Sequence, residues 1–191
     1  MYSRPEAFVI VDGGYMAKTN EVLGRDIDLG KLFDKVCEPD FTRKRTYYFD
    51  ALPWKPAQPT REQIQRYDAK QRFLDAIRFL DRTEVCLGRT QPIWLQNSST
   101  PVFVQKLVDV LLSLKMVQLA LKKDGRYFIL IAGDSDFVPA VQAVKDAGGT
   151  VRVVYCRRKT ANLNVTVHEE LLLHADERFE LTDKFCEELR R

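Results

Sequence analysis

Short apolar runs alternate along the chain with segments that have the spacing of helices. The runs with the character of strands cover residues 7–11, 43–52, 84–88, 127–132 and 150–155, with 178–181 as a short edge strand. An apolar run such as 127–132 is typical of a strand that is buried on both faces. Strands that alternate with helices predict an α/β fold with a mostly parallel central sheet of about five or six strands, covered by helices on both faces.

The helical segments differ in how clearly they are defined. Apolar residues at positions 29, 32, 33 and 36 predict a helix that ends before Pro39, whereas residues 15–28 fit either a loop or a broken helix. Thr60 and Gln63 form a capping-box pattern at the start of a long amphipathic helix. Residues 106–122 are apolar on nearly every side, which predicts a buried helix.

Two further stretches suggest additions to the basic pattern. Residues 92–95 and 101–104 have the character of short extended pieces on either side of a polar turn, and we interpret them as a hairpin-like insertion at the edge of the sheet. Residues 168–175 have helical spacing, and the segment from Thr182 onward is charged and predicts a terminal helix.

Acidic residues stand where strands end and helices begin. Asp12 follows the first strand and precedes two glycines, Asp134 and Asp136 follow the strand at 127–132, and Asp109 lies near the start of the apolar helix. In a doubly wound sheet the strand order reverses beside the first strand, so the strand at 127–132 is a candidate neighbour and these acids would meet at one edge. Carboxylates gathered without basic partners raise one another's pKa, and a divalent cation such as Mg²⁺ or Mn²⁺ removes the conflict.

Each of these acids also has a purely structural explanation. Asp134 or Asp136 could cap the helix that follows, Asp109 could interact with its helix dipole, and Asp12 could hold the turn at the two glycines. The metal-site hypothesis therefore depends on the four residues together.

Composition narrows the functional classes. The chain has 191 residues, 45% of them hydrophobic and 30% charged, and a formal net charge of +3, which is typical of a single globular domain that tolerates a polyanionic partner. No apolar run approaches the length needed to span a bilayer and the N-terminus lacks the pattern of a signal peptide, so we expect a cytoplasmic protein without a membrane partner. The four cysteines are scattered and predict reduced thiols, without disulfides or a zinc site.

The sequence resembles the NYN domains of the LabA-like group, within the PIN-like nuclease fold. The resemblance is carried by FVIVDGG at 8–14, QKLVDVLLSLKMVQLA at 105–120, ILIAGDSDFVPAVQAVKDAGGTVRVV at 129–154 and HEELLLHADERFEL at 168–181. It implies a three-layer α/β/α (Rossmannoid) domain over residues 1–181, followed by a helical tail over 182–191. It also implies a Mg²⁺- or Mn²⁺-dependent ribonuclease whose metal ligands and catalytic residues are Asp12, Asp109, Asp134 and Asp136.

Basic and aromatic residues form the expected nucleic-acid contacts. Three cations follow the fifth strand at its carboxyl end, where they could neutralise phosphates, and a tryptophan in a proline-rich loop could stack on an unpaired base, although packing is its commoner role. The residues expected to contact nucleic acid are Arg157, Arg158, Lys159, Trp54, Lys55 and Lys115.

The favoured function is an endoribonuclease that hydrolyses phosphodiester bonds with a metal-activated water. The resemblance implies that the products have 5′-phosphate and 3′-hydroxyl ends. Two positions depart from the family pattern: Tyr15 stands where an Asn is usual, and Lys115 where many relatives have an Asp. They motivate the alternative of a nucleic-acid-binding or regulatory module with weak or lost activity. A phosphohydrolase that uses an aspartyl phosphate fits less well, because Gly14 occupies the position of its second Asp.

The expected partner is RNA, single-stranded rather than double-stranded, with DNA as the alternative. An apolar edge near residues 93–104 also indicates a second copy of the chain as a candidate partner in a homodimer.

Overall fold

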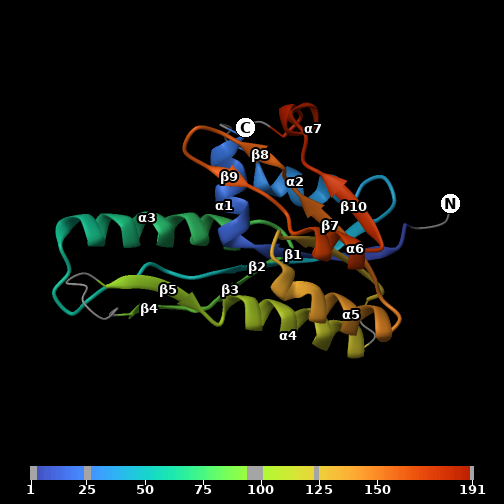
Figure 1. Ribbon diagram of the computed structural model, residues 1–191, viewed down its shortest axis with the longest axis horizontal. Coiled ribbons are helices and arrows are strands. Elements are labelled where there is room, and N and C mark those ends of the chain that lie inside the picture. The colour runs from blue at the N-terminus through green and yellow to red at the C-terminus, as the bar shows by residue number, and fades with distance from the viewer. Residues whose placement is uncertain (1–3, 24–26, 94–100, 123–124, 190–191) are drawn as a thin grey trace.

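A six-stranded parallel sheet forms the centre of the protein (Figure 1). The computed structural model describes residues 4–23, 27–93, 101–122 and 125–189. The sheet order is β10-β7-β6-β1-β2-β3, and every neighbouring pair in it is parallel. The strands are β1 (Glu6–Asp12), β2 (Thr42–Asp50), β3 (Thr83–Leu87), β6 (Tyr127–Ile131), β7 (Thr150–Tyr155) and β10 (Glu177–Glu180). This arrangement confirms the predicted α/β class and the mostly parallel sheet.

The strand order reverses beside β1, as expected. β1 pairs with β6 on one side, where Val11 lies opposite Ile131, and with β2 on the other side, where Asp12 lies opposite Phe49. The carboxyl ends of β6, β1 and β2 therefore lie next to one another along one edge, which is where open α/β sheets place their ligands.

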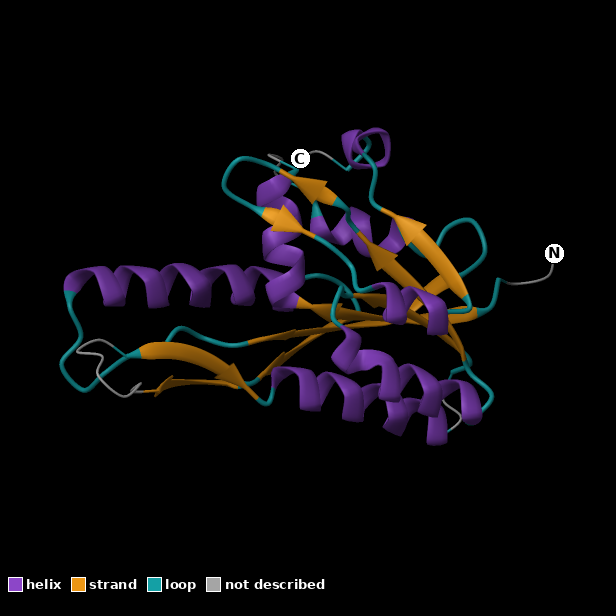
Figure 2. Cartoon of the chain, in the orientation of Figure 1, coloured by secondary structure: helices purple, strands orange, loops and turns teal. Residues whose placement is uncertain are grey.

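Helices cover both faces of the sheet (Figure 2). Alternate residues of β1 point to opposite faces: Val9 and Val11 belong to one buried core, and Phe8 and Ile10 to the other. The first core is closed by α1 (Gly13–Val22), α2 (Leu29–Lys35), α3 (Arg61–Arg78) and α7 (Asp183–Glu187), and the second by α4 (Val108–Leu121), α5 (Val138–Asp146) and α6 (Glu169–His174).

The segment that the sequence left open between loop and helix forms α1, which begins immediately after Asp12 and ends at Val22. Gly13 makes this sharp entry possible, because a Cβ atom there would lie 2.6 Å from both Oδ2 of Asp50 and the carbonyl oxygen of Phe49. The first residue of α1 therefore packs closely against the end of β2.

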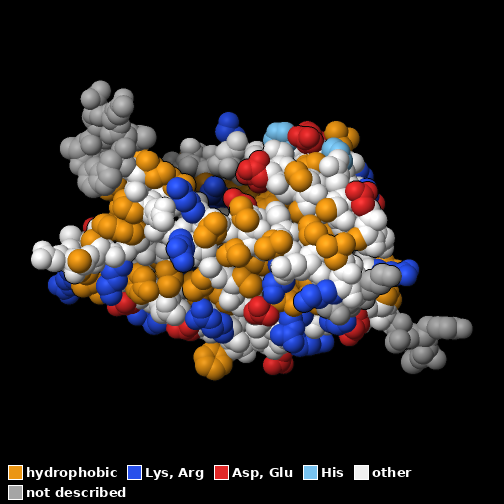
Figure 3. Space-filling view, turned by 90° about the horizontal axis from the view of Figure 1, so that it is seen from below, with side chains coloured by type: hydrophobic (Ala, Val, Ile, Leu, Met, Phe, Trp, Pro, Cys, Tyr) orange, Lys and Arg blue, Asp and Glu red, His pale blue; other side chains and the backbone are white. Residues whose placement is uncertain are grey.

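The expectation that the helix near 106–122 is buried proves wrong for its outer side. Val108, Leu112 and Met116 pack on the sheet, but Val110, Leu114 and Leu121 are 61%, 49% and 67% exposed. Figure 3 shows hydrophobic side chains gathered across this underside of the molecule. The sequence of α4 is apolar on all sides, but the helix packs against the rest of the protein on only one side.

The predicted hairpin insertion is present. β4 (Arg89–Ile93) and β5 (Val102–Lys106) pair antiparallel, and they extend alongside α3 beyond the carboxyl edge of the central sheet (Figure 1). Residues 94–100 of the proposed dimer edge lie outside the described residues. Ile93, Val102 and Phe103 at the hairpin are exposed, and pairing with a second copy stays a prediction.

The C-terminal segment packs on the domain. Cys186 and Leu189 are buried in the first core, and the carbonyl oxygen of Leu189 accepts a hydrogen bond from the backbone N–H of Asp28 at 2.8 Å. All four cysteines are free thiols. Within the described part of the chain, no helix combines the length and apolar character that a membrane crossing requires.

Candidate active site

Asp12 is the last residue of β1 and the N-cap of α1. Its Oδ1 accepts hydrogen bonds from the backbone N–H groups of Gly14 at 2.9 Å and Tyr15 at 3.1 Å, so the capping role is real. Burial raises the pKa of Asp12 to about 6, and the negative charges of Asp109 and Asp50 act in the same direction, against the two backbone hydrogen bonds. The capping role of Asp12 does not explain why two other acidic residues, Asp109 and Asp50, lie close enough to raise its pKa.

Asp134 and Asp136 follow β6 in a short 3-10 turn, Ser135–Phe137. Oδ1 of Asp134 accepts the backbone N–H of Asp136 at 3.1 Å, and both carboxylates are exposed. Gly133 brings this turn against α1, because a Cβ atom there would lie 2.3 Å from the ring of Tyr15. The adjacent ends of β1 and β6, with the close contacts at Gly13 and Gly133, place Asp12 near the acids that follow β6.

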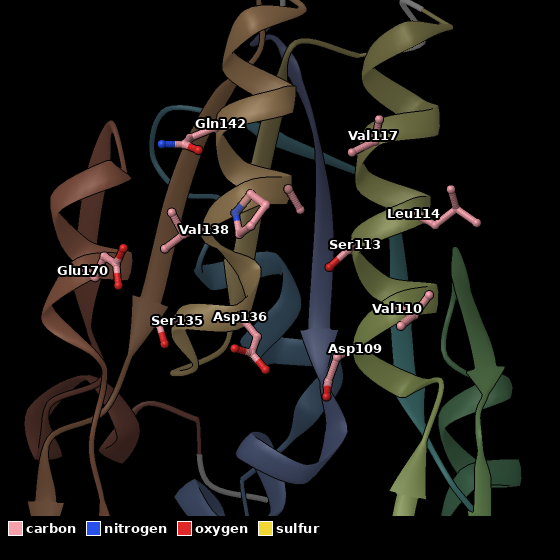
Figure 4. A pocket seen from close by; sticks show the side chains of 12 residues that line it. Asp109, Val110, Ser113, Leu114, Val117, Ser135, Asp136, Val138, Gln142 and Glu170 are labelled. Carbon is pink, nitrogen blue, oxygen red and sulfur yellow. The ribbon is translucent and has the colours of Figure 1, made fainter.

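Asp109 reaches the same edge from the first turn of α4. Burial raises its pKa, and so do the charges of Asp134 and Asp136. Figure 4 shows the carboxylates of Asp109 and Asp136 facing each other across the mouth of a pocket between α4 and α5. This pocket has a volume of about 990 Å³, and Glu170 of α6 also lines it.

A second pocket of about 350 Å³ lies on the other side of this turn. Asp12 and Asp134 line it together with Tyr15, Lys18 and His168. The four predicted acids therefore meet at one edge as two pairs, Asp109 with Asp136 and Asp12 with Asp134, and the pairs are electrostatically linked through Asp109.

The donor chemistry of the four acids suits a hard divalent cation. In the described residues none of the four forms an ion pair with Lys, Arg or His, and all their donor atoms are oxygens. Over the same residues, however, no three His, Cys, Asp or Glu side chains lie close enough together to hold one metal ion. The side chains of Asp109, Asp134 and Asp136 are exposed, so their torsion angles can adjust when a cation binds.

Several residues of this edge were missed in the sequence. Asp50 ends β2 just as Asp12 ends β1, and this shared position after an apolar strand was the available signal. Its side chain is 1% exposed, accepts the backbone N–H of Ala51 at 2.7 Å and forms an ion pair with Lys70 of α3 at 2.6 Å. Lys18 was missed because its segment was ambiguous, and nothing in the sequence marked His168 or Glu170.

The three predicted cations after β7 lie near the carboxyl edge of the sheet. Arg157 forms an ion pair with Glu169 at 2.6 Å, and Arg158 pairs with Asp183. Arg158 and Lys159 form β8 (Arg158–Lys159), which pairs with β9 (Asn164–Val165), and both side chains are exposed. Their binding to nucleic acid stays a prediction.

The other predicted contacts are more widely spread. Trp54 stacks on Phe103 of the hairpin with ring centroids 5.4 Å apart, and Lys55 lies over the ring of Tyr67. Lys115 lies 4.5 Å from the ring centroid of Tyr47 and 3.6 Å from the carboxylate of Glu84, and it lines neither acidic pocket. The structure therefore brings the four acids together but leaves Lys115 apart from them.

A crystal structure of a protein of unknown function from Vibrio parahaemolyticus aligns over 97% of this chain and 99% of its own, with a TM-score of 0.63 and 18% identity, which supports the fold alone. The catalytic domain of Thermotoga maritima CheB methylesterase aligns with a TM-score of 0.41 and 11% identity over 98% of each chain, a likeness too low to carry an argument. The curated proteins contain no match to the sequence.

The model of the NYN domain family matches residues 6–172, a span that contains all four acids and every strand of the central sheet except β10. The chain therefore belongs to the NYN domain family, a family of PIN-like nuclease domains.

Proposed function

We propose that this protein is a divalent-metal-dependent endoribonuclease of the LabA-like NYN group. The observation that carries the proposal is the meeting of Asp12, Asp109, Asp134 and Asp136, from three separate parts of the chain, where the strand order reverses. Burial is the main cause of the raised pKa values of Asp12 and Asp109, and the charges of neighbouring carboxylates act in the same direction, so the ionised acids are unfavourably placed without a cation. Binding of a cation explains why such an arrangement exists.

Each residue has a role in this proposal. The four aspartates would hold Mg²⁺ or Mn²⁺, which when bound supplies an activated water and stabilises charge that develops on the phosphate. Lys18 and His168 border the pocket of Asp12 and Asp134, where an ammonium group can pair with a phosphate oxygen. Arg157, Arg158 and Lys159 would contact the phosphates of the strand beyond the scissile bond.

The direct test is cleavage of end-labelled single-stranded RNA and of DNA of the same sequence, with Mn²⁺, with Mg²⁺ and with EDTA. We expect metal-dependent cleavage of RNA that leaves 5′-phosphate ends, and loss of at least about 100-fold of the rate in Asp134→Asn, because a direct metal ligand is removed. The variant is purified in parallel, since a contaminating nuclease would cleave in both preparations. Equal rates in the two preparations would reject the assignment.

A second function is favoured by one specific observation, the absence among the described residues of three acids placed around a common point. Under this alternative the domain binds RNA through the same edge and has lost efficient catalysis. Binding of RNA without metal-dependent cleavage would support it. In either case we expect the protein in the cytoplasm, since its four thiols are free and suit a reducing compartment.

A further inference from the structure

A separate pocket lies between α3 and the β4–β5 hairpin. Its volume is about 340 Å³, and it is lined by Trp54 from the loop after β2, Gln63, Arg66 and Lys70 from α3, and Phe103 from β5. Figure 1 shows α3 and the hairpin projecting together beyond the carboxyl edge of the sheet, on the side where α1 and α4 begin. We call this cavity the hairpin pocket. None of its lining residues lines either acidic pocket.

Two aromatic rings form one wall of the hairpin pocket. Trp54 and Phe103 are stacked with centroids 5.4 Å apart and an angle of 29° between their planes. Phe103 is nevertheless 47% exposed, and Trp54 is half-buried. Rings that are held in a fixed orientation with accessible faces are the platforms on which unpaired bases stack.

The residues that α3 contributes to the pocket include two cations. Arg66 and Lys70 are four residues apart and therefore lie on one side of the helix. The guanidinium group of Arg66 has no ion pair with an acidic side chain in the described part of the chain. The ammonium group of Lys70 donates to Asp50 at 2.6 Å and keeps two further N–H donors. A pocket with an aromatic wall and a cationic wall has the chemistry of a nucleotide site.

Gln63 supplies a polar group of defined orientation. Its side-chain Oε1 accepts the backbone N–H of Thr60 at 2.9 Å in the capping box that begins α3. Its amide N–H₂ group therefore points away from that bond and can donate to a carbonyl or ring nitrogen of a base.

Asp50 connects the hairpin pocket to the acidic edge. It holds Lys70 through one oxygen, that same oxygen borders Gly13, and its charge raises the pKa of Asp12. Lys70 thus lies at the junction of the two regions, because its partner Asp50 ends β2 and borders Gly13, the residue after Asp12.

We propose that the hairpin pocket binds one unpaired nucleotide of an RNA strand next to the scissile bond, with the base against Trp54 and Phe103 and a phosphate against Arg66 and Lys70. This inference rests on the proposed nuclease function and specifies its substrate as single-stranded, because a base held in a duplex cannot enter the pocket. It also gives the hairpin insertion a function.

Binding is measured by fluorescence anisotropy with a 5′-fluorescein-labelled single-stranded 12-nucleotide RNA in EDTA, so that no cleavage occurs. We expect Trp54→Ala and Arg66→Ala each to weaken binding by about 5-fold or more, the range for loss of one base-stacking or phosphate contact. Trp54→Phe should bind within about 2-fold of the wild-type protein because it keeps an aromatic face. Arg72→Ala removes the same charge from an exposed position of α3 outside the pocket and should change affinity less than Arg66→Ala.

The outcomes separate the pocket from the chemistry. If Trp54→Ala and Arg66→Ala both cleave and bind RNA as the wild-type protein does, the proposed role of the hairpin pocket is rejected and the nuclease function is unaffected. Binding that depends on Trp54, without cleavage in Mn²⁺, would support the pocket and reject the nuclease. Displacement of the labelled RNA by adenosine 5′-monophosphate as effectively as by unlabelled RNA would overturn the proposal in favour of a free-nucleotide site. Absence of any RNA binding by the wild-type protein would also overturn it.

Discussion

The hydroxyl group of Tyr15 accepts a hydrogen bond from the backbone N–H of Cys156 at 2.9 Å and donates one to the carbonyl oxygen of the same residue at 3.1 Å. These two bonds join the first turn of α1 to the chain just after β7, and the ring of Tyr15 lies against Gly133, next to Asp134. Tyr15 stands where an Asn is usual in the family that the sequence resembles. Its hydroxyl is fully used by the backbone, which gives Tyr15 a structural role at the rim of the pocket.

Removal of this hydroxyl should destabilise the fold. Tyr15→Phe leaves both polar groups of Cys156 without their partner in a buried position, which we expect to lower the free energy of unfolding by about 1–3 kcal/mol. Urea unfolding measures the change. The control is Tyr155→Phe, whose hydroxyl makes one exposed contact to Glu180 at 3.5 Å and should matter little. Equal stability of Tyr15→Phe and the wild-type protein would show that the bridge is dispensable.

The raised pKa of Asp12 predicts a pH dependence of stability in metal-free buffer. Its pKa is about 6 in the folded protein, against an ordinary value of 3.8. Between these values the folded state binds more protons than the unfolded state, so the free energy of unfolding falls as pH rises, by an amount on the order of 2–3 kcal/mol in total. The contribution is fully present below about pH 4 and is lost as the pH rises through about 6.

Asp12→Asn isolates this contribution. The amide oxygen can still cap α1, but the side chain carries no charge, so the variant should be more stable than the wild-type protein at pH 7 in EDTA. The difference should shrink toward zero near pH 4, where Asp12 is protonated. Urea unfolding at both pH values is the measurement, and a variant that is less stable at pH 7 would contradict the prediction.

The sequence supports the position of Asp12 beside Asp134 better than any other feature of the site. Asp12 ends one apolar parallel strand and Asp134 follows shortly after another, and one topological rule makes these strands neighbours, so two local patterns were sufficient. The position of Asp109 was less well supported, because its helix begins after a hairpin that local patterns place only approximately, and the family resemblance then selected the same four acids. The pairing of the acids into two pockets depends on side-chain torsions and on the approach of Gly133 to Tyr15, which no spacing in the sequence encodes.

Features that depend on pairing between distant elements were not predictable. Lys70 is one of many charged residues on an amphipathic helix, and only the tertiary structure shows that it reaches the buried carboxylate of Asp50. The outer side of α4 was misjudged for a related reason. An apolar sequence reports a preference for burial, whereas the number of neighbouring elements decides whether Val110 and Leu114 are covered.

The ion pair between Asp50 and Lys70 should be important for stability because one partner is almost fully buried. Lys70→Met leaves the Asp50 carboxylate buried without its cation, and we expect a loss of about 3–5 kcal/mol of unfolding free energy at pH 7. The double variant Asp50→Asn/Lys70→Met should recover a large part of this loss, since the uncompensated charge is removed. A double variant as unstable as Lys70→Met would mean that packing of the lysine stem dominates.

Metal binding should reverse the electrostatic cost at the acidic edge. A cation that binds only the folded state stabilises it by about 2.7 kcal/mol at a concentration of 100 times its Kd, which corresponds to a rise in Tm of about 5–10 °C for a domain of this size. We therefore expect Mn²⁺, added to protein stripped with EDTA, to raise Tm in differential scanning calorimetry. The rise should be lost in Asp12→Asn and in Asp134→Asn.

Asp146→Asn is the matched control for this experiment, because Asp146 is an exposed acid at the far end of α5 and lines neither acidic pocket. The rise in Tm should persist in Asp146→Asn. A rise that also persists in Asp12→Asn and Asp134→Asn would place the cation elsewhere on the surface. The same comparison tests the sign of the effect at Asp12: its replacement should raise stability in EDTA and lower it, relative to the wild-type protein, in saturating Mn²⁺. This reversal is expected only for a carboxylate whose charge destabilises the metal-free protein and which is itself a ligand of the bound cation.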